Sequence, residues 1–232
     1  MQHYFASVKD GYVHLSESDA HHVLHVMRMK IGDTLVAIDN GKEYLADIKG
    51  LSPLTIEVSE ELDTNNELQS DITLLYCLAK GDKIELVIQK ATELGAKRIA
   101  LISSKYCVTK LDNEAFKKKL PRYQAIAKEA SEQCHRQMIP EILGVYDINK
   151  IPSELLSDIN LVAYEKCGDN PSLDNKEKSI SILIGSEGGF DPKEIEMLQS
   201  EGFKSISLGK RILRTETAAI YALSVIGYLL ER

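Results

Sequence analysis

The sequence predicts an α/β protein with a mostly parallel β-sheet, preceded by a small N-terminal β-barrel. Up to about residue 60 it contains short strand-like runs separated by turn residues, and after residue 70 apolar strand-like runs alternate with amphipathic helical ones. Between these regions, residues 60–67 are polar, acidic and without periodicity, as a linker would be. We therefore expect two domains, 1–68 and 69–232.

The first domain has the strand spacing of a small barrel. Turn residues such as Gly32-Asp33 and Asn40-Gly41 divide its strands, which we expect at 12–15, 34–38, 44–48 and 54–58. One helix interrupts them, with Ser16 as its N-cap, and it runs through Val23 and Met27.

The second domain alternates between strand-like and helical patterns of apolar residues. We expect strands at 72–78, 98–102, 159–164, 180–185 and 204–208, and helices at 82–94, 114–134, 192–200 and 216–230. Gly95 closes one helix, and Asp191-Pro192 opens another as N-cap and first helical residue. This alternation predicts a parallel sheet with helices on both faces.

Composition limits the function classes. The chain is 44% hydrophobic, which is enough for substantial cores, but it has no run of eighteen apolar residues and no signal-peptide pattern. We expect a cytoplasmic protein with no membrane contact. The four cysteines lack metal-ligand spacing, which predicts reduced thiols and no metal site.

The net charge of −7 at first argues against a nucleic-acid partner. All of this excess lies in the first 70 residues, and the remainder of the chain is balanced. Because phosphate binding depends on local lysines and arginines rather than on the sum, RNA remains a possible partner.

Two loops after neighbouring strands are the best candidates for a ligand site. The first, 185–190, is neither a dinucleotide fingerprint nor a P-loop, and Ile184 stands where a nucleophile elbow requires glycine. By itself it is equally well explained as an ordinary turn. The second, 208–218, adds three cations, Lys210, Arg211 and Arg214. Together the loops favour a nucleotide-like cofactor beside a phosphate or base. The apolar helix 216–230 is more typical of packing or of a subunit interface.

At these residues the chain resembles the 16S ribosomal RNA uridine-N3 methyltransferases of the knotted SPOUT superfamily. The resemblance lies in ordered blocks over nearly the whole chain, at 21–33, 80–95, 129–136, 185–190 and 208–218. It implies a PUA-like barrel that helps to hold RNA and a C-terminal α/β domain with a trefoil knot. Sequence pattern alone would not propose a knot, because chain connections rarely form one.

The resemblance also implies ligands and partners. The cofactor would be S-adenosylmethionine, held by Tyr164, Glu165, Gly185, Glu187, Gly188, Leu208, Gly209, Ile212 and Leu213. The RNA would be 16S rRNA in the small ribosomal subunit, contacted by Arg28, Lys30, Lys80, Lys105, Arg136 and Arg211. The protein would act as a homodimer. Three places depart from the family pattern: Ser186 and Lys210 replace proline, and Lys105-Tyr106-Cys107 replaces Glu-Arg-Ser.

Methylation of uridine at N3 requires that the nitrogen lose its proton. A cation near O2 or O4 would stabilise the resulting anion, and a carboxylate would accept the proton. Our candidates are Arg214 as the cation and Glu129, Glu132 or Glu216 as the base. The alternatives are structural, because Glu216 can simply favour a helix N-terminus and the other two can lie on a solvated face.

Three other interpretations stay open. His21 and His25, four residues apart beside His22, could bind metal, although we prefer phosphate contacts by Arg28 and Lys30. The chain could also be a non-catalytic RNA-binding or assembly factor on the same fold. A Rossmann oxidoreductase is less compatible, because the phosphate fingerprint and its acidic ribose partner are missing.

Overall fold

The computed structural model describes residues 1–167 and 178–231. The chain divides into two compact units, of which the first comprises Met1–Glu67 with Lys128–Ile139 and the second comprises Leu68–Ala127 with Pro140–Arg232. The first unit thus includes a segment from the middle of the chain, which a single boundary at 68 and 69 does not anticipate. No described helix is long and apolar enough to cross a membrane.

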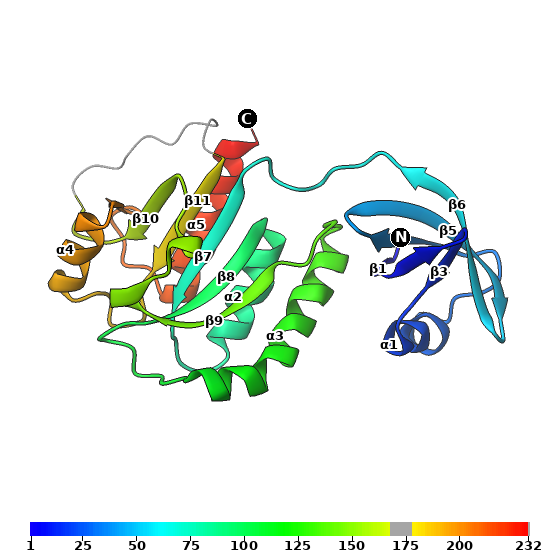
Figure 1. The fold of residues 1–232 in the computed structure, drawn as a ribbon, viewed down its shortest axis with the longest axis horizontal. Helices are drawn as coiled ribbons and strands as arrows, with labels where there is room; N and C mark the ends of the chain where they lie inside the picture. Colours follow the sequence, from blue (N-terminus) through cyan, green and yellow to red (C-terminus); the bar gives the residue numbers. More distant parts are fainter. Residues whose placement is uncertain (168–177, 232) are drawn as a thin grey trace. The chain divides into compact units, whose positions relative to one another are not determined.

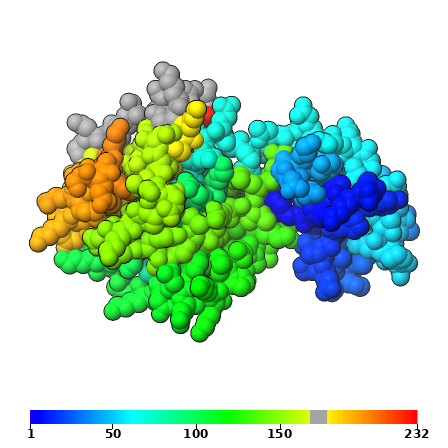
Figure 2. Space-filling view, in the orientation of Figure 1, coloured from blue at the N-terminus to red at the C-terminus, as the bar shows by residue number. Residues whose placement is uncertain are grey.

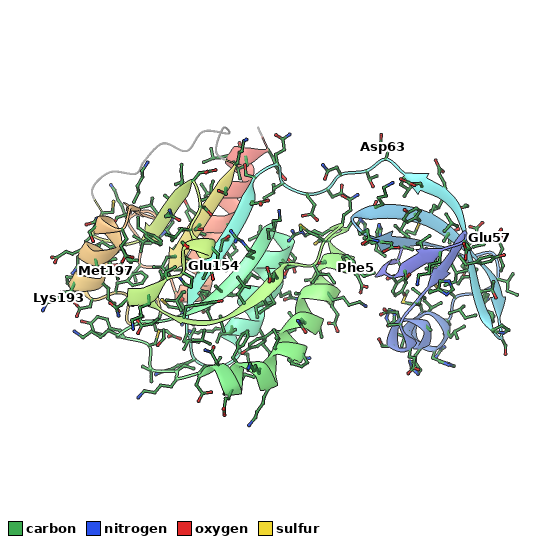
Figure 3. The ribbon with its side chains drawn as sticks, viewed as in Figure 1. Phe5, Glu57, Asp63, Glu154, Lys193 and Met197 are labelled. Atoms are coloured by element: carbon green, nitrogen blue, oxygen red, sulfur yellow. The ribbon has the colours of Figure 1, made fainter. Side chains whose placement is uncertain are left out.

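The first unit is built on a six-stranded sheet in the order β1-β4-β5-β6-β3-β2. Its strands are β1 (His3–Phe5), β2 (Ser7–Lys9), β3 (Tyr12–His14), β4 (Thr34–Asp39), β5 (Lys42–Leu51) and β6 (Leu54–Leu62). Only β1 and β4 are parallel; the other pairs are antiparallel. Asn40 and Gly41 both have positive φ, as the tight turn between β4 and β5 requires. Phe5 and Glu57 mark β1 and β6 in Figure 3.

The helix expected after Ser16 is present but changes its winding. In α1 (Glu17–His21) the Ser16 hydroxyl accepts a hydrogen bond from the amide of Asp19 at 3.1 Å. A π-helical turn, η1 (His22–Val26), follows directly and buries Val23. Helical structure therefore ends one residue before Met27, and Arg28 has a left-handed backbone with φ of 52°. The expected N-cap is confirmed.

The second unit contains a parallel sheet in the order β12-β10-β11-β7-β8-β9. Its strands are β7 (Asp71–Cys77), β8 (Ala96–Ser103), β9 (Glu141–Asp147), β10 (Ile159–Ala163), β11 (Ser179–Ile184) and β12 (Phe203–Ile206). Every pairing among them is parallel, which confirms the predicted sheet. Strand β9 was not predicted. It is an edge strand in which only Ile142 is buried, and Gly144 at its centre interrupts the apolar residues.

Helices cover both faces of this sheet (Figure 1). On one face lie α2 (Lys83–Glu93), α3 (Asn113–Gln133) and α5 (Thr215–Leu230), packed on Leu74 and Tyr76 of β7. On the other lie α4 (Pro192–Ser200) and the 3-10 turns η2 (Ile148–Lys150) and η3 (Ser153–Leu155), packed on Leu75 and Cys77. Alternate residues of β7 are thus buried on opposite faces, which explains its continuous apolar run.

Helix α4 has the start that its sequence predicts. Asp191 is the N-cap, Pro192 the first helical residue, and Glu194 completes a capping box. Lys193 and Met197 mark this helix in Figure 3, and Figure 2 shows it in orange on the surface of the second unit.

Candidate active site

Three strand ends meet at one edge of the parallel sheet. Strand β10 lies between β11 and β12 and is parallel to both, so the segments that follow these strands leave the sheet side by side. They enclose a cavity of about 480 Å³. All nine residues expected to bind the cofactor line this cavity, namely Tyr164, Glu165, Gly185, Glu187, Gly188, Leu208, Gly209, Ile212 and Leu213.

The glycine loop after β11 requires its small residues. Gly189 has a φ of +67° and donates its amide to the carbonyl of Ser186 at 2.9 Å, which closes a tight turn. A Cβ at Gly188 would lie 2.8 Å from Cβ of Tyr106, closer than real side chains approach. The loop therefore packs directly on the segment that follows β8.

The second loop is joined to the first through Thr215. This residue is buried at the start of α5, and its hydroxyl donates a 2.6 Å hydrogen bond to the carbonyl of Gly185. Gly209, with φ of +103°, turns the chain after β12. Ile212 lines the cavity yet is 81% exposed, which is unusual for a large apolar side chain.

A lysine between two carboxylates lies at the cavity, and the sequence did not point to it. Lys83, at the start of α2, lines the cavity, and its Nζ lies 2.8 Å from Oε1 of Glu187 and 3.3 Å from Oε2 of Glu216. That Glu216 oxygen is buried and accepts no aligned hydrogen bond. The three residues come together because β7, which precedes α2, pairs with β11. In sequence, Lys83 resembles any solvated lysine in the first turn of a helix.

The structure divides the four expected catalytic residues between the units. Arg214 is exposed at the N-cap of α5 and lines the cavity, and Glu216 lies in the first turn of this helix, beside Lys83. Glu129 and Glu132 belong to the first unit. Glu129 is exposed, whereas Glu132 accepts the amide of Phe5 at 3.0 Å and pairs with Lys128 at 3.0 Å.

Burial raises the pKa of Glu132, although the hydrogen bonds from the Phe5 amide and from Lys128 oppose this. These contacts tie the end of α3 to β1, which is a structural role for Glu132. Of the four candidates, Arg214 lines the cavity, and Glu216 lies behind the wall, paired with the cavity residue Lys83.

The expected RNA contacts also have different surroundings. Arg211 lines the cavity, and the side chains of Lys80, Arg28 and Lys30 are exposed. Lys105 is exposed but forms an ion pair with Asp191. The described contacts of Arg136 are structural, because it is 3% exposed and makes hydrogen bonds of 2.6 to 3.2 Å to the carboxylate of Glu67. An RNA contact by Arg136 stays a prediction, and the burial of this side chain argues against it.

The histidines near α1 do not form a metal site in the structure. The rings of His21 and His25 are 4.7 Å apart, but Nδ1 of His22 makes a 2.9 Å hydrogen bond with the hydroxyl of Tyr4. Across residues 1–167 and 178–231, no group of three or more His, Cys, Asp or Glu side chains is arranged to hold a metal ion.

The fold and the cavity together define a class, that of α/β proteins which bind a ligand at the carboxyl edge of a parallel sheet. Residues 66–227 match the RNA methyltransferase domain, and residues 15–61 match the RNA methyltransferase PUA domain. The chain therefore belongs to the RNA methyltransferase family, with a PUA-like N-terminal unit and a SPOUT-type C-terminal unit.

Similar proteins cover nearly its full length. The ribosomal RNA small subunit methyltransferase E of Bacillus subtilis is 34% identical over 100% of this chain and 98% of its own length. A methyltransferase from Legionella pneumophila, solved with bound S-adenosylmethionine, is 31% identical, with a TM-score of 0.87 over 98% of this chain and 96% of that chain. The ribosomal RNA small subunit methyltransferase E of Neisseria gonorrhoeae, also solved with S-adenosylmethionine, is 28% identical, with a TM-score of 0.85 over 99% of this chain and 98% of that chain.

Proposed function

We propose that this protein is an S-adenosylmethionine-dependent methyltransferase that methylates N3 of a uridine in 16S ribosomal RNA. The observation that carries the proposal is the cavity at the ends of β10, β11 and β12, because it unites both loops that the sequence singled out. The names of its relatives support the RNA of the small subunit as the substrate.

The residues of the cavity suit S-adenosylmethionine. Its volume of about 480 Å³ lies in the range of small-molecule sites. Apolar side chains from Leu208, Ile212 and Leu213 offer a surface for the adenine, and backbone groups at the strand ends offer hydrogen bonds. The carboxylates of Glu165 and Glu187 are complementary to the cationic groups of this cofactor. When bound, it supplies an electrophilic methyl group on sulfur.

The protein has to make N3 of the uracil nucleophilic and hold it in line with that methyl group. Arg214 is an exposed cation that lines the cavity, so it can stabilise negative charge on O2 or O4 as the proton leaves. Positioning supplies much of the remaining acceleration, and no covalent intermediate is needed.

Glu216 is the proton acceptor that the contacts favour. Its Oε2 accepts no aligned hydrogen bond, so it has a lone pair available, and its neighbour Lys83, 3.3 Å away, lines the cavity. Glu132, by comparison, already accepts the Phe5 amide and pairs with Lys128, and Glu129 is solvated. We therefore assign the base to Glu216 ahead of the other two.

We further propose that the enzyme acts as a homodimer in which the partner covers the cavity. Ile212 is 81% exposed, and α5 presents Tyr221, Val225 and Tyr228 at 40% to 55% exposure. An apolar surface of this kind beside a ligand site is typical of a subunit interface. A sedimentation measurement that gives the mass of one chain at micromolar concentration would overturn this assignment.

The PUA-like unit would contribute affinity for RNA. Arg28 and Lys30 are exposed, and within the described part of the chain neither forms an ion pair, so both can meet phosphates. A substrate in the small ribosomal subunit makes the cytoplasm the expected compartment.

The decisive experiment compares 16S RNA from cells with and without this protein by mass mapping. We expect one uridine of the RNA from cells without the protein to lack a methyl group that it carries in the parent cells. The purified protein with S-adenosylmethionine should restore it. Unchanged RNA in the deletion strain would favour the rival function, a non-catalytic assembly factor on the same fold.

A further inference from the structure

Tyr106 is a half-exposed aromatic residue at the rim of the cavity. It lies in the segment after β8, and 40% of its surface is exposed. Its Cβ would be 2.8 Å from a Cβ placed at Gly188, which lines the cavity and is itself exposed. Because Gly188 has no side chain, the wall of the cavity comes directly against Tyr106.

The side chain of Tyr106 is held at both ends. Its Cβ packs on Gly188, and its hydroxyl donates a 3.1 Å hydrogen bond to Oδ2 of Asp191, the N-cap of α4. A tyrosine restrained in this way loses little conformational entropy when something binds to its ring.

Other aromatic residues around the cavity show what a packing role looks like. Phe190, in the same glycine loop, is 6% exposed, and Tyr76, at the end of β7, is completely buried. Tyr106 differs from both, since it keeps a large exposed fraction although its position is restrained. Its ring therefore has surface available for a ligand.

A cation accompanies this ring. The Nζ of Lys105 lies 5.6 Å from the ring centroid, and its side chain is 61% exposed although it is paired with Asp191. The hydrogen bond to Asp191 raises the pKa of Lys105, which keeps it charged at neutral pH. An exposed ring next to a lysine is the combination with which proteins hold unpaired nucleotides, one group stacking on the base and the other meeting a phosphate.

We propose that Tyr106 is a stacking platform for a base of the RNA substrate at the mouth of the cavity, and that Lys105 contacts the adjoining phosphate. This inference rests on the proposed function. An enzyme that modifies a base has to hold it out of its stack, and an aromatic face at the rim stabilises that state. A planar guanidinium can also stack on a base, so an arginine at this position would retain this chemistry.

The test is steady-state methyl transfer to small ribosomal subunits from a strain that lacks the protein. Three variants separate the properties of the side chain: Tyr106→Leu keeps bulk without an aromatic face, Tyr106→Phe keeps the ring without the hydroxyl, and Tyr106→Arg replaces the ring by a planar guanidinium. We expect kcat/KM for the subunits to fall about 10-fold or more in the Leu variant, mainly through KM. The Phe and Arg variants should recover most of this loss.

The dissociation constant for S-adenosylmethionine, measured by calorimetry, separates binding of RNA from a structural role. It should stay within about twofold of the unsubstituted protein in all three variants, because stacking on RNA makes no contact with the cofactor. Unchanged kcat/KM in the Leu variant would overturn the inference, and so would an equal loss of cofactor affinity. If the unsubstituted protein binds no cofactor or transfers no methyl group, the proposed function itself fails.

Discussion

Lys83 donates a 2.8 Å hydrogen bond to Oε1 of Glu187 and thereby joins helix α2 to the glycine loop of the cavity. Burial disfavours the charged form of Glu187. Hydrogen bonds from Lys83 and from the amide of Lys80 outweigh this and hold the pKa of the carboxyl below its ordinary value. Lys83 also lies 3.3 Å from Oε2 of Glu216, so one ammonium group pairs with two carboxylates.

We expect Lys83→Met to move the acid limb of cofactor binding to higher pH. The folded-state pKa of Glu187 is now depressed, so its contribution to stability is present above the ordinary pKa and is lost as the pH falls through the lowered value. Without Lys83 that pKa rises, and protonation begins at higher pH. Carbon NMR of labelled glutamates, together with calorimetry at several pH values, would measure both effects.

The matched control is Lys80→Met. Lys80 contacts Glu187 only through its backbone amide in the described structure, so this variant removes a nearby charge but keeps the hydrogen bond. An equal shift of the Glu187 pKa in both variants would mean that the overall positive charge nearby, and not the contact with Lys83, lowers this pKa.

Arg214→Ala should remove methyl transfer and leave the fold intact. Loss of one group that stabilises a developing anion costs about 100-fold to 1,000-fold in kcat. The side chain is exposed, and the N-cap position uses only its backbone, so thermal unfolding should change little. Arg214→Lys is the control, because it retains the charge but not the planar geometry. Near-normal turnover by the Ala variant would remove Arg214 from the mechanism.

Replacing both Arg28 and Lys30 by Ala should weaken RNA binding and reduce its dependence on salt. Each lost phosphate contact lowers the slope of log affinity against log salt concentration by about one. Filter binding at several salt concentrations gives the slope. Lys49→Ala is a suitable control, because this lysine of β5 is paired with Asp47. If the affinity for RNA and the salt slope both stay unchanged, Arg28 and Lys30 make no phosphate contact and the PUA-like unit acts only as a spacer.

Cys107 should be the thiol that is alkylated at a pH too low for an ordinary thiol to react. A hydrogen bond from Cys77 and others from Ser104 lower the pKa of Cys107 to about 6, although burial opposes this. The thiolate is therefore populated above pH 6 and lost below it. Burial raises the pKa of Cys77, which should not react. Iodoacetamide labelling followed by peptide mass mapping from pH 5 to 9 tests this.

A labelling rate at Cys107 that keeps rising up to pH 9, as an ordinary thiol shows, would contradict the lowered pKa. Ser104→Ala supplies the internal comparison. It removes a hydroxyl 3.2 Å from the Cys107 sulfur, so the midpoint should move to higher pH.

Glu67→Gln should destabilise the first unit strongly. The guanidinium of Arg136 is 3% exposed and pairs with this carboxylate at 2.6 Å, so the variant removes the negative charge from a buried ion pair, which costs about 3 to 5 kcal/mol. Denaturant unfolding measures the change. The double variant Glu67→Leu with Arg136→Met should recover much of it, because both charges are then removed. Equal stability of the single and double variants would show that the pair is not coupled.

Much of the fold was predictable because local chemistry specifies it. The capping box at Asp191, the stop at Gly95 and the alternation of apolar strands with amphipathic helices all depend on neighbours in sequence. Strand β9 was missed for the opposite reason, since Gly144 interrupts its apolar residues and the strand forms by pairing with β8, which lies far from it in the sequence. The short strand β1 likewise depends on a distant partner, β4.

For the site, the sequence by itself determined which two loops could bind a ligand. Glycines, turn residues and helix caps mark the ends of strands through residues that are neighbours in the sequence. It did not determine which charged residues accompany them. Only the tertiary structure decided that Lys83 lies between Glu187 and Glu216, that Tyr106 stands against Gly188, and that Arg136 is buried against Glu67. The physical reason is that charge pairing and burial are set by strand order and sheet packing, which bring together residues 69 to 133 positions apart in the chain.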